Sequence, residues 1–518
     1  MQKRSSGILL HISSLPGSPG IGTIGKPAHR FIDKLAAAGQ TLWQILPLGP
    51  TGYGDSPYAP FSSFAGNEIL IDCFELCETG FLETDECKIL NTLPDHSVDY
   101  WAVKQAVLPL LNLAARRFHE KSAHDPQYLA FKKQHAYWLE DYAVFMSIKN
   151  HHDEKAQREG AVSTWNTYWP MELRKHDSRA VQEWKKEYEQ EIELLKIIQY
   201  FFFSQWVRVK KYARQKNIAI IGDIPIFVAL DSADVWSHPE LFNLDSNFAQ
   251  LTVAGVPPDY FSPTGQRWGN PTYRWSEHKR TKFKWWIERM RLFMEFYDYV
   301  RIDHFRGFAG YWSVPAENET AEHGEWLPAE GHALFTQMEK FFGKPLPIIA
   351  EDLGVITPDV VALMETFNFP GMKVLQFAFD GQRINGLYAG TNQFLPHNCP
   401  VMSVIYTGTH DNDTLAGKYS NAPEWEKACI AEYLGYWPES FTRALVMEAL
   451  KSVSQFAVIP MQDILELGSE ARMNTPSVLG GNWIWRMKEE DFNEEQQNWL
   501  KALSWRYGRN LPAVDEQN

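Results

Sequence analysis

The sequence predicts an α/β protein of the (β/α)8 TIM-barrel class with large, mostly helical insertions. Three features lead to this prediction. Eight short apolar runs follow one another along the 518 residues, helical patterns separate several of them, and most runs end in polar or glycine-rich residues. Near-continuous apolar runs are typical of strands that are buried on both faces, and such a barrel requires eight of them. We expect residues 1–518 to form a single barrel.

The predicted strands lie, in chain order, in runs that start at Gly7, Thr41, Ile218, Tyr297, Leu346, Met372, Ser403 and Gln455. Helical patterns at 31–39 and 281–296 support the alternation of strand and helix. The competing interpretation is two doubly wound domains, which would need a G-x-G-x-x-G turn after the first strand. Prolines interrupt the glycines in the segment HISSLPGSPGIGTIG (11–25), so we reject that interpretation.

Two insertions interrupt the regular alternation. The stretch between the second and third strands is far longer than a barrel crossover needs and is rich in helical patterns, so we expect a helical inserted subdomain over about 60–205. Between the third and fourth strands, about 245–275 is polar, aromatic and rich in glycine and proline, which is typical of a functional loop. Only a short tail follows the eighth run, so we expect no C-terminal β-domain.

Composition narrows the class of partner. The formal net charge of −14 disfavours nucleic acid, which requires a basic surface. No apolar run approaches the roughly 18 residues that span a bilayer, so we expect no membrane partner. An odd number of cysteines, five, and the lack of a signal-peptide pattern favour reduced thiols and a cytoplasmic location. The 20 Trp, 21 Tyr and 31 Phe could stack on sugar rings, although such residues also build cores.

Three carboxylates follow three of the predicted strands. Asp303 lies in YVRIDHF, Glu351 in LPIIAEDLG and Asp411 in YTGTHDND. Strand alternation places Arg301 and Asp303 on the same inward face. Because strand ends converge at the mouth of a barrel, we expect the acids to share one cleft. Any one of them could simply cap a turn or pair with an arginine, but three together, two of them next to a His, favour catalysis.

The motifs RIDHF, AEDLG and GTHDND, in this order, resemble the catalytic motifs of the α-amylase clan. The resemblance narrows to 4-α-glucanotransferases, also called amylomaltases or disproportionating enzymes, through GILLHISSLPGSPGIGTIG, LPLGPTGYGDSPYAPFSSFAGN, GDIPIFVALDSADVWSHPELF, GVPPDYFSPTGQRWGNP and ARMNTPS. It extends from about residue 5 to about residue 487. It implies transfer of α-1,4-glucan segments between maltooligosaccharides, with retention and with neither a metal nor another cofactor. Amylases usually add a β-rich C-terminal domain, so its expected absence agrees with the transferases.

The resemblance also implies roles for the three acids. Asp303 would be the nucleophile, Glu351 the general acid/base and Asp411 the stabiliser of the transition state. Retaining chemistry needs an ionised carboxylate and a protonated carboxyl about 5–5.5 Å apart. We expect Arg301 to keep Asp303 ionised, and we expect apolar surroundings and nearby negative charge to raise the pKa of Glu351.

A set of substrate-binding residues follows from the same resemblance: Arg301, His410, Tyr58, Ser56, Asp259, Tyr260, Phe261, Gln266, Trp268, Asn474, Pro476 and Asp223. Within this set, Tyr58 would stack on a donor sugar, and the segment 259–268 would form a lid of aromatic residues over the acceptor. Such a lid excludes water and so favours transfer over hydrolysis. Asp223 fits a supporting role equally well, and His304 fits an ordinary hydrogen-bonding role.

Two other functions remain open at this point. One is an α-glucan hydrolase on the same scaffold, and the other is an α-glucan-binding protein without catalysis. The presence of all three acids argues against the second. The sequence makes no prediction of the oligomeric state.

Overall fold

The structure is a computed structural model that describes residues 4–258 and 262–510. Its centre is a sheet of eight parallel strands in the order β10-β13-β14-β1-β2-β3-β6-β9. The strands are β1 (Ser5–Leu9), β2 (Leu42–Gln44), β3 (Ala219–Pro225), β6 (Tyr299–Asp303), β9 (Ile348–Ala350), β10 (Gly371–Val374), β13 (Ser403–Tyr406) and β14 (Phe456–Pro460). Each coincides with one of the predicted runs, so the predicted barrel class is confirmed.

The strands follow one another around the barrel in chain order, and β9 and β10 close it. The two closing strands do not form a ladder with each other in the hydrogen-bonded order. Instead, the backbone N–H of Ala350 donates to the carbonyl of Pro370 at 2.9 Å. The N–H of Met372 donates to Oδ1 of Asp352 at 2.6 Å. A backbone bond and a carboxylate therefore bridge the last gap.

The barrel strands are short and buried on both faces, as the apolar runs predict. All residues of β9, β10, β13 and β14 are buried. Strand β3 combines this burial with a close approach at Gly222, where a Cβ atom would lie 2.2 Å from the ring of Tyr297. Glycine at this position therefore lets Tyr297 pack directly against the strand that carries Asp223.

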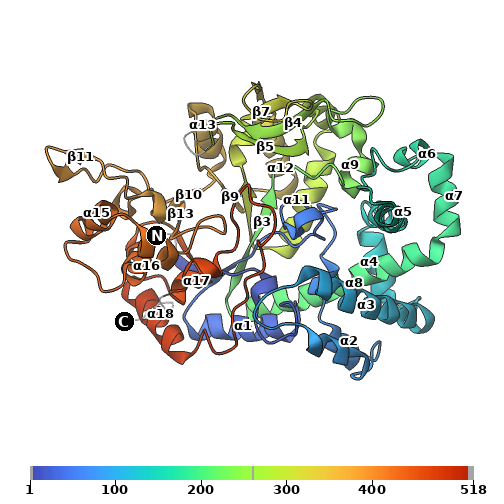
Figure 1. The fold of residues 1–518 in the computed structure, drawn as a ribbon, viewed down its shortest axis with the longest axis horizontal. Coiled ribbons are helices and arrows are strands. Elements are labelled where there is room, and N and C mark those ends of the chain that lie inside the picture. The colour runs from blue at the N-terminus through green and yellow to red at the C-terminus, as the bar shows by residue number, and fades with distance from the viewer. Residues whose placement is uncertain (1–3, 259–261, 511–518) are drawn as a thin grey trace.

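Helices surround these strands (Figure 1). Those that follow the barrel alternation are α1 (Lys26–Ala37), α11 (Lys284–Phe296), α12 (Gly331–Phe342), α13 (Pro358–Phe367), α16 (Phe441–Lys451) and α18 (Glu494–Arg506). Helix α1 packs on α18, α18 on α16, and α12 on both α11 and α13. After β14 the described chain forms helices and no further strand. None of the described helices is long and apolar enough to cross a membrane.

A helical layer lies between β2 and β3 in the chain and at the right of Figure 1. It contains η2 (Tyr53–Asp55), η3 (Glu68–Leu70), α2 (Cys73–Glu78), η4 (Glu86–Thr92), α3 (Tyr100–Ser122), α4 (Pro126–Gln134), α5 (Leu139–Glu159), α6 (Met171–Arg174), α7 (Arg179–Glu187) and α8 (Glu189–Gln215). Helix α8 packs on α3 and α5 and also on α1 of the barrel. It continues past residue 205, where we placed the boundary, because its apolar face is buried along most of its length.

A second, antiparallel sheet covers one side of the barrel and appears at the top of Figure 1. Its strands, in the order β5-β4-β7-β8, are β4 (Thr252–Val256), β5 (Gln266–Pro271), β7 (Gly310–Pro315) and β8 (Glu325–Pro328). Part of the segment 245–275, which the sequence analysis treats as a loop, is therefore strand. The pairing of β4 with the distant β7 stabilises this arrangement, and a single-sequence pattern does not reveal such a partner.

The remaining elements are short connections. They are η1 (Ile12–Ser14), α9 (Ala233–Ser237), η5 (Pro239–Leu241), α10 (Trp275–Arg280), η6 (Phe305–Phe308), η7 (Leu375–Phe377), β11 (Arg383–Ile384), β12 (Leu387–Tyr388), η8 (Pro396–Asn398), α14 (Leu415–Asn421), α15 (Glu424–Leu434), α17 (Met461–Ile464) and η9 (Ser469–Ala471).

Candidate active site

An arginine joins two carboxylates at the carboxyl ends of β3 and β6. The parallel register pairs Asp223 with Arg301 across these strands. Nη1 of Arg301 donates to both oxygens of Asp223, at 2.8 and 2.7 Å, and Nη2 donates to Oδ1 of Asp303 at 2.9 Å. Burial opposes the charge of Arg301, but the negative charges of Asp223 and Asp303 outweigh it and raise the pKa of Arg301 well above its usual value. Arg301 is therefore a fixed cation beside Asp303.

Glu351 follows β9 and is held by two backbone N–H groups. His304 donates to its Oε2 at 2.7 Å, and Leu353 donates to its Oε1 at 2.8 Å. Burial and the charge of Asp303 raise the pKa of Glu351 to about 8, although Arg301 and the two N–H groups lower it. The raised pKa predicted for Glu351 is confirmed, and this side chain carries a proton at neutral pH.

Asp411 lies in the loop after β13 and is tied to a second loop. Its Oδ1 accepts a hydrogen bond from Nδ2 of Asn474 at 2.6 Å. Arg472 donates through Nη2 to the carbonyl of Asp411 at 2.6 Å and through Nε to the carbonyl of Asn474 at 2.7 Å. Arg472 thus clamps the two loops together. The sequence analysis quoted it within ARMNTPS without assigning it a role.

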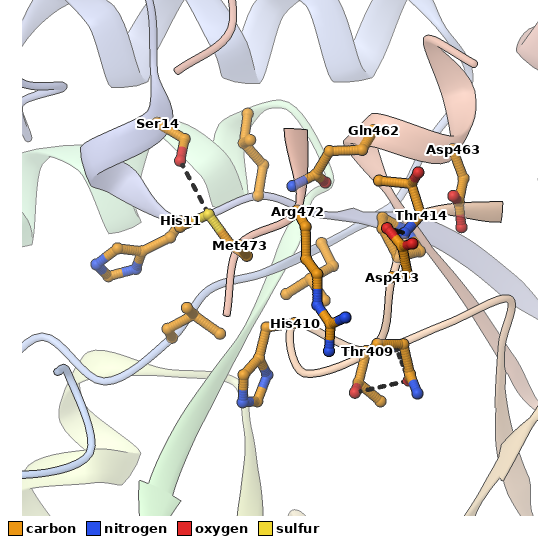
Figure 2. Close-up of a pocket in the computed structure, with 15 residues that line it drawn as sticks. His11, Ser14, Thr409, His410, Asp413, Thr414, Gln462, Asp463, Arg472 and Met473 are labelled. Atoms are coloured by element: carbon orange, nitrogen blue, oxygen red, sulfur yellow. Dashed lines mark hydrogen bonds between the residues drawn. The ribbon is translucent and has the colours of Figure 1, made fainter. Parts of the chain in front are cut away.

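A buried acid fixes the same loop from below. Asp463 follows β14 and accepts hydrogen bonds from the hydroxyl of Thr407 at 2.6 Å and the N–H of Leu415 at 2.8 Å. These partners lie on either side of Asp411 in the chain, and burial raises the pKa of Asp463 to about 6. Figure 2 shows Asp463 beside Thr414, with Arg472 reaching toward the Thr409–His410 segment. The sequence analysis did not single out Asp463, although it ends the eighth predicted strand.

Aromatic rings form the rim next to Asp411. The rings of Tyr58 and His410 stack with their centroids 4.9 Å apart and their planes 18° apart. The hydroxyl of Tyr58 donates to Oδ2 of Asp223 at 2.8 Å, and its N–H donates to Oγ of Ser56 at 3.2 Å. Trp483 packs against both stacked rings at 5.9–6.0 Å. Trp483 was not predicted, and its polar and glycine-rich neighbours carry no motif that would have identified it.

Two cavities meet at the catalytic acids. The first, which we call the Tyr58 cavity, has a volume of about 430 Å³ and is lined by Ser56, Tyr58, His410, Asn474, Pro476 and Trp483, among others. The second, the Glu351 cavity, has a volume of about 650 Å³, and Asp303, Glu351 and Asp411 all line it. Trp268, His304, Asp303 and Asp411 line both cavities. The three predicted acids therefore face one continuous cleft.

Trp268 lies at the junction of the two cavities. Its ring meets that of His304 edge to face, with centroids 4.7 Å apart, and its Nε1 donates to Oε1 of Gln266 at 3.3 Å. Burial, together with the charge of Arg306, lowers the pKa of His304 to about 3, so this histidine is neutral. Gln266 is not among the residues that line either cavity and meets the site through Trp268.

The other predicted lid residues, Asp259, Tyr260 and Phe261, lie outside the described residues. Asp223 is fully buried, lines neither cavity, and is engaged by Arg301 and Tyr58. We therefore favour a supporting role for Asp223 over contact with a ligand. Within residues 4–258 and 262–510, no group of three or more His, Cys, Asp or Glu side chains is arranged to hold a metal ion.

Comparison with known proteins agrees with this geometry. The family model described as 4-alpha-glucanotransferase matches residues 10–493. The 4-alpha-glucanotransferase of Thermus thermophilus is 47% identical over 511 residues, which cover 97% of this chain and 98% of that protein. The corresponding protein of Synechocystis sp. is 45% identical over 521 residues, covering 99% and 100%.

The fold is similar over its whole length to that of a solved structure. The amylomaltase from Streptococcus agalactiae, in complex with acarbose, superposes with a TM-score of 0.91 at 38% identity and covers 98% of this chain and 100% of its own. The matched family model and the relatives at 45–47% identity each span nearly the whole chain. This chain therefore belongs to the 4-alpha-glucanotransferase family.

Proposed function

We propose that the cleft transfers α-1,4-glucan segments by double displacement, with Asp303 as nucleophile, Glu351 as general acid/base and Asp411 as the stabiliser of the transition state. One observation carries this assignment. A carboxylate bonded to a fixed arginine and a carboxyl with a pKa of about 8 line the same cavity. Retaining glycosyl transfer requires one carboxylate that attacks the anomeric carbon and one protonated carboxyl that protonates the leaving oxygen.

In the first step, Asp303 attacks the anomeric carbon of the donor while the glycosidic bond breaks. Glu351 gives its proton to the leaving oxygen, so the released sugar departs as an alcohol. In the second step, Glu351 takes the proton from the 4-hydroxyl of an acceptor sugar. The acceptor oxygen bonds to the anomeric carbon, and Asp303 leaves as a carboxylate. The hydrogen bond from Arg301 to Oδ1 of Asp303 holds the attacking carboxylate in place.

The rim residues position the sugars. The side chain of Asp411 is 47% exposed, so it can accept hydrogen bonds from sugar hydroxyls while Asn474 fixes its other side. We assign Tyr58, Ser56, His410, Asn474 and Pro476, which line the Tyr58 cavity, to the donor sugar. An apolar sugar face can stack on such rings.

We assign Trp268 and Gln266, with Asp259, Tyr260 and Phe261, to the acceptor side. A bound acceptor and an aromatic cover keep water from the covalent intermediate, which favours transfer over hydrolysis. The amylomaltase of S. agalactiae was solved in complex with acarbose. We propose that the same cleft of this chain binds maltooligosaccharides and other α-1,4-glucans.

Incubation with maltotriose tests the assignment. Transfer produces glucose and longer oligomers while the number of reducing ends stays constant. A rise in reducing ends would instead identify a hydrolase, and unchanged sugar would identify a binding protein. The Asp303→Asn variant, assayed in parallel, shows whether the conversion comes from this site.

We also propose that the protein acts in the cytoplasm. Its five cysteines are free, and the Sγ atoms of Cys77 and Cys87 lie 3.3 Å apart as thiols. Neighbouring thiols that stay unpaired fit a reducing compartment.

A further inference from the structure

The Glu351 cavity extends from the catalytic acids toward α14 and α15. Gln376, Phe394, Trp425 and Glu426 line it together with the acids. In Figure 1, α15 and β11 lie at the left of the molecule, away from the barrel strands β3 and β9 near the centre. The cavity therefore continues past the site of bond cleavage onto a separate part of the surface.

A tryptophan on α15 stands open in this part of the cavity. Trp425 is the second residue of α15, and 54% of its surface is exposed. One edge of its indole lies against Gly381, where a Cβ atom would approach Cζ3 to 2.9 Å and Cε3 to 3.2 Å. Gly381 also adopts a φ of +72°, which glycine tolerates best. The glycine thus allows the backbone to support one edge of the ring while much of the ring stays exposed.

The helix that carries Trp425 is fixed at its first turn. The carboxylate of Glu426 pairs with Nζ of Lys418 at 3.0 Å, and its side chain is only 12% exposed. Nζ of Lys418 also donates to the carbonyl of Gln376 at 2.8 Å. The start of α15 is therefore joined to α14 and, through Lys418, to η7, which follows β10. A ring held in this way is set in position before a ligand arrives.

The hairpin formed by β11 and β12, which lies beside Trp425, is joined to α15 through Glu432. Nη2 of Arg383 pairs with Oε2 of Glu432 at 3.0 Å, and the N–H of Tyr388 donates to Oε1 of Glu432 at 3.1 Å. Gly381, which contacts the indole, lies just before this hairpin. The helix that carries Trp425 and the backbone that contacts its ring are therefore joined to each other through Glu432. Trp425 therefore presents an exposed ring, supported by the backbone at Gly381, to the same cavity that the catalytic acids line.

We propose that Trp425 is a stacking platform for a glucosyl residue of the bound glucan, several sugars away from the bond that is cleaved. The proposal rests on the function assigned to the cleft above. The apolar face of a pyranose ring fits a flat indole, and a cavity of about 650 Å³ is large enough for a ligand of more than one sugar ring. Trp425 would then make the enzyme favour longer chains, because short ones do not reach it.

The alternative is that Trp425 only packs against the hairpin. Chain length separates the two roles, since a packing residue affects all substrates equally. Trp437 provides a matched control because it follows α15, is 55% exposed, and is not among the residues that line the cavity. Its ring packs against Phe441 instead.

The experiment compares wild type with Trp425→Ala, Trp425→Phe and Trp437→Ala. Initial transfer rates are measured with maltotriose, maltopentaose and maltoheptaose as donors to labelled glucose, and with glucose, maltotriose and maltopentaose as acceptors from a fixed donor. For Trp425→Ala we expect KM to rise about three- to tenfold for the longest chains in at least one series. We expect maltotriose with glucose to react as in wild type, Trp425→Phe to regain part of the loss, and Trp437→Ala to match wild type.

An equal loss at every chain length, together with a lower melting temperature, would show that Trp425 only packs. Unchanged kinetics at every length would equally overturn the platform. Both results leave transfer by the wild type intact, so they are distinct from a failure of the proposed function, in which the wild type itself would not transfer.

Discussion

The floor and the rim of the cleft are built in different ways. The floor, which we define as Asp223, Arg301, Asp303 and Glu351, comes from the ends of neighbouring strands. Its side chains are held by hydrogen bonds of 2.7–2.9 Å, from Arg301 to the two aspartates and from two backbone N–H groups to Glu351. The rim, defined as Tyr58, His410, Asn474 and Trp483, comes from separate loops. Its contacts include ring packing at 4.9–6.0 Å, a hydrogen bond from the side-chain amide of Asn474 to Asp411 and one from the hydroxyl of Tyr58 to Asp223.

The difference indicates a division of labour. Strand pairing sets Asp223 opposite Arg301 and Pro225 opposite Asp303, so the register of the barrel places both aspartates within reach of Arg301. The loops of the rim set the shape of the site and the places where sugars can stack. Changes to the floor should therefore act on the chemical step, and changes to the rim should act on binding.

The largest effect is expected from the two acids of the floor. Asp303→Asn removes the nucleophile, and Glu351→Gln removes the transferable proton. We expect kcat with maltotriose to fall at least about 10³-fold for Asp303→Asn and about 10²- to 10⁴-fold for Glu351→Gln. Circular dichroism and melting temperature check that both variants fold.

Glu365→Gln serves as the matched control, since it changes an exposed carboxylate on α13. Its turnover should equal that of wild type. Near-normal turnover in either Asp303→Asn or Glu351→Gln would remove the roles that we assign to the floor.

A smaller loss is expected from Arg301→Lys. The lysine keeps the positive charge, but its single ammonium cannot hold Asp223 and Asp303 at once as the guanidinium does. Because Asp303 then loses its fixed position, we expect kcat to fall about 100-fold. Steady-state kinetics measure the loss, and Arg214→Lys, at a surface pair with Asp298, is the control. A change in KM alone would show that Arg301 acts in substrate binding rather than in positioning Asp303.

The pH profile should show the protonated state of Glu351. Its pKa of about 8 means that the proton needed for the first step is present at neutral pH and is lost as the pH rises through that value. We expect kcat/KM to fall above about pH 8, by up to tenfold per pH unit. The rate of transfer between pH 4 and pH 10, with the fold checked at each pH, measures this limb. If kcat/KM instead began to fall as the pH rose past about 5, burial would not be keeping Glu351 protonated.

The floor could be predicted from the sequence to a large extent. Alternation along YVRIDHF placed Arg301 and Asp303 on one face, and the apolar run before Glu351 indicated a raised pKa. Both follow from local patterns, because a buried parallel strand has a period of two and a defined carboxyl end. The eight strands were predicted from near-continuous apolar runs, which are typical of strands buried on both faces.

The rim depends on contacts between segments far apart in the chain. Trp483 reaches Tyr58 and His410, and Arg472 joins two loops, but no periodic pattern marks either residue. The pairing of β4 with β7 was missed for the same reason, since each strand is short and its partner is remote. Tyr58 and Asn474 were predicted through the resemblance to a family rather than through physical patterns.

The smallest effect is expected from Tyr58→Phe, and it tests where the rim begins. This variant keeps the ring that stacks on His410 and loses the hydroxyl that donates to Asp223. Arg301 still holds both oxygens of Asp223, so these two side chains stay in position. We expect KM for maltotriose to rise by about fivefold or less with little change in kcat, whereas Tyr58→Ala, which also removes the ring, should raise KM further. If Tyr58→Phe instead lowered kcat as far as Arg301→Lys does, the hydroxyl of Tyr58 would act as part of the floor, while its ring would still belong to the rim.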